Sequence, residues 1–359
     1  MPSSFLAAVV KKMSTAFALG DAIAKALLYV LPSQWSTRIQ KNCGEVSFLV
    51  LKTGKTKTKR KMTLIEGVFA TLLFDLAIFN TDNFFINFII RTFTRFQNSW
   101  DRPFINQSEA KDEVGKFCEN IGIEQTPWVW DKQPQEYKCL NDFFSRTYAP
   151  AYAPSIGDQD VVSPACCTMS LYSDNGSLQR LLIKGCDYAL DKVGLRPPED
   201  LTLYAKNKVL LGYLSPSDYH RCHAPIEGKV VHLKMEDSQA MSASVKFWGG
   251  KFNLLNKNKR LVVVIESTDD RATEPPTRVA LVVVGGVGVD TIVYDPNMLG
   301  KSIEKGGEIS TFRAGGSAIA MFSNTELNFR KDFLDAVSTE ETPVQVMVGE
   351  SLAQYSQKI

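Results

Sequence analysis

Two of the three histidines lie three residues apart, in a segment that also carries an aspartate and a tyrosine. His220 and His223 stand in the sequence Asp-Tyr-His-Arg-Cys-His-Ala-Pro-Ile-Glu-Gly, which spans 218–228. Histidine ordinarily titrates near neutral pH, so this pair is suited to exchange protons with a reacting group. Loop histidines that only make structural hydrogen bonds are the alternative interpretation.

A metal site is a weaker hypothesis for the same two histidines. Their spacing suits a helix, but Pro216, Pro225 and Gly228 oppose a long helix through this segment. No set of cysteines or carboxylates follows at the spacing of a zinc site. We therefore expect no metal, and a loop bounded by proline and glycine that carries His220 and His223.

A second candidate for chemistry is Ser317, which follows two glycines and precedes the apolar run 318–322. Glycine admits strained backbone angles at little steric cost. In a strained turn, the Ser317 hydroxyl can attack the carbonyl of Gly316. Taken alone, Gly-Gly-Ser is a common turn pattern and carries little information.

Taken together and in order, these pieces resemble the pyruvoyl-dependent phosphatidylserine decarboxylase family. The resemblance runs from about residue 115 to 325, and the histidine segment is its most specific part. The first hundred residues carry little of it. The matching segments are Leu140–Arg146 (LNDFFSR), Val162–Ala165 (VSPA), Ile183–Leu190 (IKGCDYAL), Asp218–Gly228, Asn253–Asn256 (NLLN), Lys305–Glu308 and Phe312–Ser317.

The resemblance implies a self-cleaving decarboxylase of phosphatidylserine that forms phosphatidylethanolamine. In this family, the serine equivalent to Ser317 attacks the preceding glycine, here Gly316, and the chain splits. The serine becomes a pyruvoyl group, which accepts electrons as carbon dioxide leaves the substrate. By the same resemblance, His223 activates Ser317, with His220 and Asp218 as its neighbours.

One position departs from the family pattern. An aspartate normally follows Ser-Pro-Ala and completes an Asp-His-Ser triad, but this sequence has Cys166 there. A carboxylate that orients a catalytic histidine contributes up to about 10⁴ in rate, and a neutral thiol does not replace it. Asp158, Asp160 and Asp218 are the carboxylates that could take its place.

Two other functions follow from this departure and from the family. One is decarboxylation of a soluble amino acid such as tryptophan. The other is an uncleaved, catalytically impaired member that binds lipid or a protein partner, and Cys166 is its main support. Liposome binding and a carbonyl-reactive probe would separate the three hypotheses.

The composition is that of an ordinary globular protein. Of 359 residues, 44% are hydrophobic and 22% are charged, and the net charge of +2 argues against a nucleic-acid partner. Seven cysteines without regular spacing favour a reducing, intracellular compartment over a secreted disulfide framework. Mitochondrial and endomembrane locations are both compatible with this pattern.

The N-terminal region, 1–115, is expected to be helical, with apolar helical periodicity over 5–31 and an amphipathic pattern over 84–96. The basic run 52–61 is predicted to be a solvated loop. It precedes an apolar stretch that begins at Met62, an order that suits contact with an anionic membrane surface. The expected partners are phosphatidylserine or an anionic membrane surface and, as a separate expectation, a second copy of the chain.

The remainder, 116–359, is expected to form the decarboxylase-like domain. Short β-rich runs occur here between clusters of Gly, Pro, Asn and Asp. They predict an α+β fold in which a mainly antiparallel sheet follows the helical segment, and in which Ser317 begins a strand near the histidine loop. The predicted strands are 209–214, 230–233, 261–265, 279–284 and 318–322.

Overall fold

The chain divides into two compact units, one formed by 1–47 with 58–90 and the other by 48–57 with 91–359. Apart from 45–47 and 58–60, which are the N-terminal half of β1 (Glu45–Val50) and the C-terminal half of β2 (Lys55–Arg60), the described residues belong to the second unit. The computed structural model describes residues 45–50, 55–60, 114–115, 117–118, 123, 129–172, 180–183, 186–189, 204, 207–236, 258–269, 276–285, 292–313, 317–338 and 344–356.

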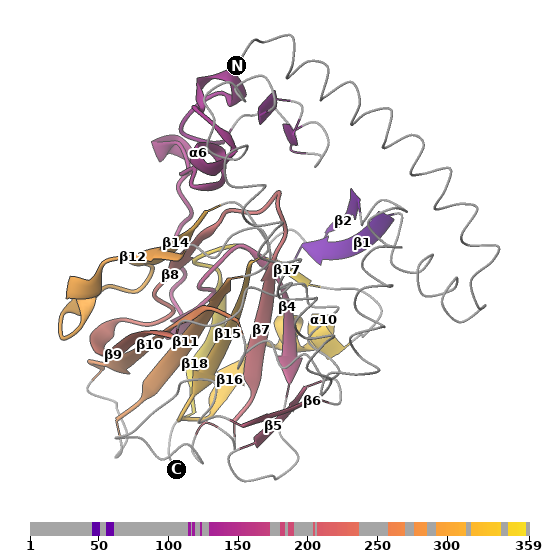
Figure 1. Ribbon diagram of the computed structural model, residues 1–359. Helices are drawn as coiled ribbons and strands as arrows, with labels where there is room; N and C mark the ends of the chain where they lie inside the picture. The colour runs from indigo at the N-terminus through magenta and orange to yellow at the C-terminus, as the bar shows by residue number, and fades with distance from the viewer. Residues whose placement is uncertain are drawn as a thin grey trace, which may run out of the picture. The chain divides into compact units, whose positions relative to one another are not determined.

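A large sheet is the main element of this unit. Its strand order is β13-β9-β10-β11-β15-β7-β4-β17-β1-β2, and the row from β9 to β4 is seen side by side in Figure 1. Neighbours from β13 to β17 are antiparallel, whereas β17 and β1 are parallel. The strands are β1 (Glu45–Val50), β2 (Lys55–Arg60), β4 (Cys167–Tyr172), β7 (Val209–Leu214), β9 (Gly228–Glu236), β10 (Arg260–Ser267), β11 (Arg278–Gly285), β13 (Ser302–Ile303), β15 (Ser317–Ser323) and β17 (Val344–Val346).

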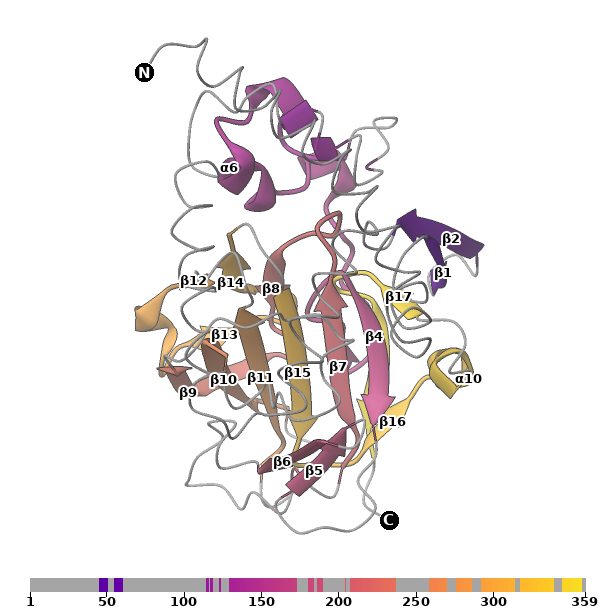
Figure 2. The same ribbon diagram turned by 45° about the vertical axis from the view of Figure 1, so that its right-hand side comes forward.

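Three smaller sheets and several short helices complete the described structure. The small sheets have the orders β12-β14-β8, β16-β18-β3 and β5-β6, and Figure 2 shows β12, β14 and β8 together. The strands are β3 (Val161–Val162), β5 (Arg180–Ile183), β6 (Cys186–Ala189), β8 (Arg221–His223), β12 (Ile292–Tyr294), β14 (Glu308–Phe312), β16 (Leu327–Phe329) and β18 (Ser351–Tyr355). The helices are η2 (Pro134–Glu136), α6 (Leu140–Phe144), η3 (Pro150–Tyr152), η5 (Pro296–Met298) and α10 (Lys331–Ser338).

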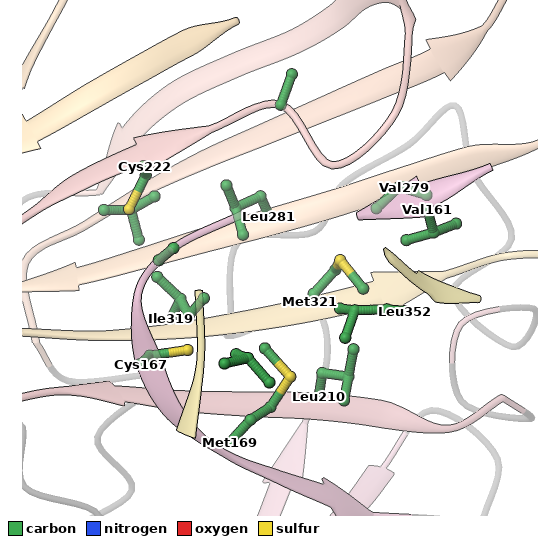
Figure 3. Close-up of a cluster of buried hydrophobic side chains, with 14 of the residues drawn as sticks. Val161, Cys167, Met169, Leu210, Cys222, Val279, Leu281, Ile319, Met321 and Leu352 are labelled. Atoms are coloured by element: carbon green, nitrogen blue, oxygen red, sulfur yellow. The ribbon is translucent and has the colours of Figure 1, made fainter. Parts of the chain in front are cut away.

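The core lies on one face of the large sheet. Alternate residues of the central strands point to this face, where they meet side chains from β3, β16, β18 and α10. Figure 3 shows Leu281, Ile319, Met321 and Leu210, from three adjacent strands, gathered in this cluster with Leu352 of β18. Burial of each such side chain stabilises the fold by about 1.5–3 kcal/mol.

The predicted antiparallel sheet and the α+β class are confirmed. All five predicted strands lie within β7, β9, β10, β11 and β15, and the prediction for 209–214 coincides with β7. These runs are rich in Val, Ile and Leu because β10 and β11 are buried along nearly their whole length.

The solvated loop predicted over 52–61 is wrong for its central part. Lys55–Arg60 is a strand, β2, at the edge of the large sheet. Lysine and threonine alternate here, and β-branched threonine favours strands while lysine protects an exposed edge from further pairing. β1 is likewise a strand within the region 1–115. The helices expected over 5–31 and 84–96 lie outside the described residues, and the division at 115/116 stays a prediction.

In the part of the chain that the structure describes, no helix has the length and hydropathy that crossing a bilayer requires.

Gly228, the last residue of the histidine motif, is required by close strand packing. A Cβ atom at this position would lie 2.0 Å from the carbonyl oxygen of Glu266 and 2.7 Å from its carbonyl carbon. Gly228 pairs with Ser267 on one side and with Ile303 on the other, so the backbone has little room to move.

We expect Gly228→Ala to lower the free energy of unfolding by about 1–3 kcal/mol, because the methyl group would push β9 away from β10. Urea denaturation measures this change. Gly115→Ala is the matched control, since a Cβ there meets nothing within 4 Å and the position is helical. Equal stability of the two variants would contradict the assignment of Gly228 to close packing.

Candidate functional site

The histidine segment begins where β7 ends, and a tight turn shapes it. The Asp218 N–H donates to the Ser215 carbonyl at 2.7 Å, and the Asp218 carboxylate accepts the Ser215 N–H at 2.7 Å. Gln345 donates to the other carboxylate oxygen at 3.3 Å. An aspartate at this place in a turn commonly binds the backbone in this way. The Asp218 carboxylate is therefore committed to the turn.

Arg146 anchors this turn to the rest of the fold. Its guanidinium donates to the carbonyl oxygens of Ser217 at 3.0 Å and Asp218 at 2.6 Å. It lies between the rings of Trp130 and Phe143, each centroid 4.3 Å away. Burial lowers the pKa of Arg146 to about 10, so the side chain remains a cation at neutral pH. The arginine of the Asn-Asp-Phe-Phe-Ser-Arg segment thus fixes the position of the histidines.

His220 is fully buried behind this turn. Its Nδ1–H donates to the Asp218 carbonyl at 2.8 Å, since a carbonyl oxygen can only accept. The rings of Phe144 and Phe312 stand edge-on to the imidazole, with centroids 5.0 and 6.4 Å away. Its place favours a role in holding the segment over direct contact with a substrate.

His223 ends a strand. The loop predicted for both histidines is wrong here, because Arg221–His223 forms β8 and His223 pairs with Glu308 of β14. The Nδ1 atom of His223 lies 2.9 Å from the Gly306 carbonyl, and its Nε2 atom lies 3.2 Å from the Tyr219 hydroxyl.

The surroundings of His223 keep its imidazole neutral. Burial lowers the pKa of His223 below its ordinary value, while the Gly306 carbonyl and Glu308 act in the opposite direction and Arg221 adds to the lowering. Arg221 and Glu308 form an ion pair at 2.8 Å, so their effects on the imidazole largely offset each other. A neutral imidazole near neutral pH can accept a proton, as a general base must.

Ser317 is the first residue of β15, at the middle of the large sheet. It pairs with Leu214 of β7 and with Gly285 of β11. Its side chain is 1% exposed, and its hydroxyl oxygen has no hydrogen-bond partner among the described residues. Ser310 and Ser356 also have buried hydroxyls without a partner among the described residues, so this feature is compatible with a catalytic role for Ser317 without proving one. Gly316 lies outside the described residues.

The strand order relates Ser317 to the histidines. Leu214, its partner in β7, is the last residue before the turn that carries His220. The sheet therefore places the serine beside the strand end from which the histidine segment leaves. Within the described residues, no hydrogen bond joins the Ser317 hydroxyl to His220 or His223.

Cys166 is buried in an aromatic cluster next to the histidine segment. Its Sγ atom accepts the Val348 N–H at 3.3 Å and lies 3.4 Å from the Tyr148 hydroxyl. Trp130 and Tyr219 belong to the same cluster.

The three aspartates that could replace a carboxylate at position 166 are engaged elsewhere. Asp158 accepts from the Ser351 hydroxyl at 3.2 Å, Asp160 accepts from the Tyr355 N–H at 2.9 Å, and Asp218 holds its own turn. In His223, Nδ1 contacts the Gly306 carbonyl and Nε2 contacts the Tyr219 hydroxyl, so neither ring nitrogen contacts a carboxylate.

Neither metal binding nor a cysteine nucleophile is supported at this site. Across the described residues, no group of three His, Cys, Asp or Glu side chains could hold a metal ion. Burial raises the pKa of Cys222, which lies between the histidines, to about 12, so its thiol stays protonated.

Comparison with known proteins identifies the family. The model of the phosphatidylserine decarboxylase family matches residues 140–354, which is more than half of the chain and includes both histidines and Ser317. The chain belongs to the phosphatidylserine decarboxylase family. It is 24% identical over 299 residues to a phosphatidylserine decarboxylase proenzyme of Fusobacterium nucleatum, covering 82% of this chain and 93% of that protein.

Two further relatives of the decarboxylase family carry similar names. A phosphatidylserine decarboxylase proenzyme of Chlamydia pneumoniae is 28% identical over 237 residues, covering 65% of this chain and 70% of that protein. The phosphatidylserine decarboxylase proenzyme 2 of Komagataella phaffii is 26% identical over 226 residues, which span 61% of this chain and 22% of that protein.

Sequence reasoning missed two contacts that the site depends on. Tyr219 belongs to the histidine motif, but the motif gives no sign that its hydroxyl contacts His223. The Gly306 carbonyl is a backbone atom, for which a sequence pattern gives no signal beyond the two glycines at 306–307.

We expect Arg146→Met to reduce the free energy of unfolding by about 2–4 kcal/mol, because the Ser217 and Asp218 carbonyls lose their donor inside the protein. Chemical denaturation measures it. Lys132→Met removes a half-exposed cation that pairs with Asp142 and should cost less than about 1 kcal/mol. A loss for Arg146→Met as small as the control's would show that the turn does not depend on the guanidinium.

Proposed function

We propose that this chain is a phosphatidylserine decarboxylase that forms phosphatidylethanolamine after cleaving itself between Gly316 and Ser317. The observation that carries the proposal is the Ser317 hydroxyl, buried and without a hydrogen-bond partner among the described residues, at the first residue of a central strand. The family match, which spans this serine and both histidines, supports the same conclusion.

The processing step uses groups of the chain itself. The Ser317 oxygen adds to the Gly316 carbonyl carbon, the peptide C–N bond breaks, and the hydroxyl proton passes to the released nitrogen, which leaves an ester and a free amine. Removal of the Ser317 Hα then expels the Gly316 carboxylate. Hydrolysis of the resulting enamine releases ammonia and leaves a pyruvoyl group at position 317.

His223 is the group proposed to carry the proton in that step. Its imidazole is neutral near pH 7 because burial lowers its pKa, so Nε2 offers a lone pair to the Ser317 hydroxyl once this hydroxyl replaces that of Tyr219 at the nitrogen. His220 and Asp218 hold the segment in place through the Asp218 carbonyl and the turn at Ser215.

The pyruvoyl group, once formed, supplies an electron-accepting carbonyl for loss of carbon dioxide from an amino acid. The residues present fit this group, because the serine that would form it is buried and its hydroxyl has no competing hydrogen bond among the described residues. His223 is the proposed proton donor for the product carbon. Phosphatidylserine in an anionic membrane surface is the proposed substrate, and a homodimer stays a prediction.

Cys166 favours a second candidate function, that of an uncleaved member of the family that binds lipid or a partner. Neither nitrogen of the His223 ring contacts a carboxylate, and a thiol in an aromatic cluster stands where the family aspartate is expected. The two candidates differ in one covalent property, the integrity of the bond before Ser317.

Intact mass under denaturing conditions decides between these candidates. We expect two fragments split at Gly316–Ser317, the smaller one lacking a free amino terminus and labelled by a carbonyl-reactive probe. Ser317→Ala should remain a single species of about 40.0 kDa. Ser323→Ala, which changes a buried serine at the other end of β15, should still be cleaved. A wild-type protein that stays whole would favour the binding function.

A second prediction concerns Cys166. We expect Cys166→Asp to speed self-cleavage at least tenfold, because a carboxylate there restores the orienting charge of the family triad, whose loss costs up to about 10⁴ in rate. Cys166→Ser is the control, since it keeps a small neutral side chain. The time course of fragment formation measures the rates. Equal rates for the aspartate and serine variants would show that this chain does not process itself through position 166.

A further inference from the structure

The tautomer of His223 follows from its two partners. A carbonyl oxygen can only accept, so the proton lies on Nδ1, which donates to Gly306 at 2.9 Å. Nε2 of the neutral ring then carries a lone pair, and the Tyr219 hydroxyl at 3.2 Å is its donor. Burial raises the pKa of Tyr219 well above its ordinary value, so the phenol keeps the proton that it donates.

We propose that Tyr219 is a positioning residue for His223: the Gly306 carbonyl orients the Nδ1–H in place of the missing carboxylate, and the Tyr219 hydroxyl holds Nε2 until the Ser317 hydroxyl displaces it. The two rings also stack, with centroids 5.7 Å apart and planes inclined by 25°. The hydrogen bond and the stacking restrain the ring in two directions. This inference rests on the proposed function only in that His223 moves the Ser317 proton.

The position of Tyr219 is itself determined by an aromatic stack that ends at Cys166. Tyr219 is 5% exposed, and the Tyr148 ring lies 4.8 Å from it and the Trp130 ring 6.2 Å from it, centroid to centroid. Tyr148 in turn contacts the Cys166 sulfur. The neutral thiol thus supports the ring that supports Tyr219. Cys166 therefore influences the orientation of His223 through packing. A carboxylate at position 166 would influence it through charge.

The charged groups around His223 are consistent with this arrangement. Glu308 and Arg221, on the paired strands β14 and β8, face the imidazole but neutralise each other in their ion pair. Tyr219 is the remaining titratable group in direct contact with the ring among the described residues, and it stays a neutral phenol.

Nitrogen NMR of protein labelled at its three histidines tests the proposal, with signals assigned by His223→Gln and His220→Gln. At a pH where His223 is neutral, we expect a protonated Nδ1 and an unprotonated, hydrogen-bonded Nε2. In Tyr219→Phe the Nε2 signal should move further from that of a protonated nitrogen, because its donor is gone. Tyr148→Phe keeps the stacked ring and should leave the signal in place.

Self-cleavage kinetics provide the second arm. Tyr219→Phe should speed fragment formation about 2- to 10-fold, because the Ser317 hydroxyl no longer has to displace one hydrogen bond from Nε2 while the stacked ring is kept. The same change should have no effect in a His223→Gln background, because a positioning residue acts only through its partner. A protonated Nε2 in the wild type, or an Nε2 signal unmoved in Tyr219→Phe, would overturn the proposal. The NMR measurement tests the role of Tyr219 even if the wild-type chain is never cleaved. Absence of cleavage would contradict the proposed function alone.

Discussion

A buried guanidinium links the two parts of the sequence from which the site is made. Arg146 follows the short helix α6, and the carbonyls that it binds belong to residues more than seventy positions later in the chain. Without this contact the turn at 215–219 would lose its link to the end of α6 and would keep its internal hydrogen bonds and the contact between Gln345 and Asp218. Everything that depends on the turn, including the orientation of His220 and the departure point of β8, depends on the arginine too. Its burial against two rings shields the contact from dissolved salt, because buried charges are screened much less than exposed ones.

The sheet could be predicted from the sequence because each strand is specified by the residue types within its own short run. Runs such as 261–265 and 279–284 consist of β-branched and aliphatic residues that fit a doubly covered strand and little else. The basic run shows the opposite case. Its charge suggested a loop, but the alternation of Thr and Lys at an edge position was the stronger determinant.

The site could be predicted only in part. Motif order gave Ser317, His220 and His223, and the structure places the serine at the start of a strand as expected. The sequence could not show that His223 would lie in β8, because that strand pairs with residues more than eighty positions later. Nor could it show which groups bind the imidazole. The direction of a side chain and the partner of a backbone carbonyl depend on tertiary packing. Neither produces a repeating pattern in the sequence.

The pairing of β15 has a consequence for what a broken bond before Ser317 would mean mechanically. Residues 317–359 supply β15, which lies between β7 and β11, and also β16, β17 and β18, which are paired within two sheets. A cut at that point would remove covalent continuity while leaving every one of these ladders intact. The two chains would stay joined through these paired strands for as long as the fold is native. Cleavage would thus leave the size and shape of the native protein unchanged, and only a denaturing measurement would reveal it.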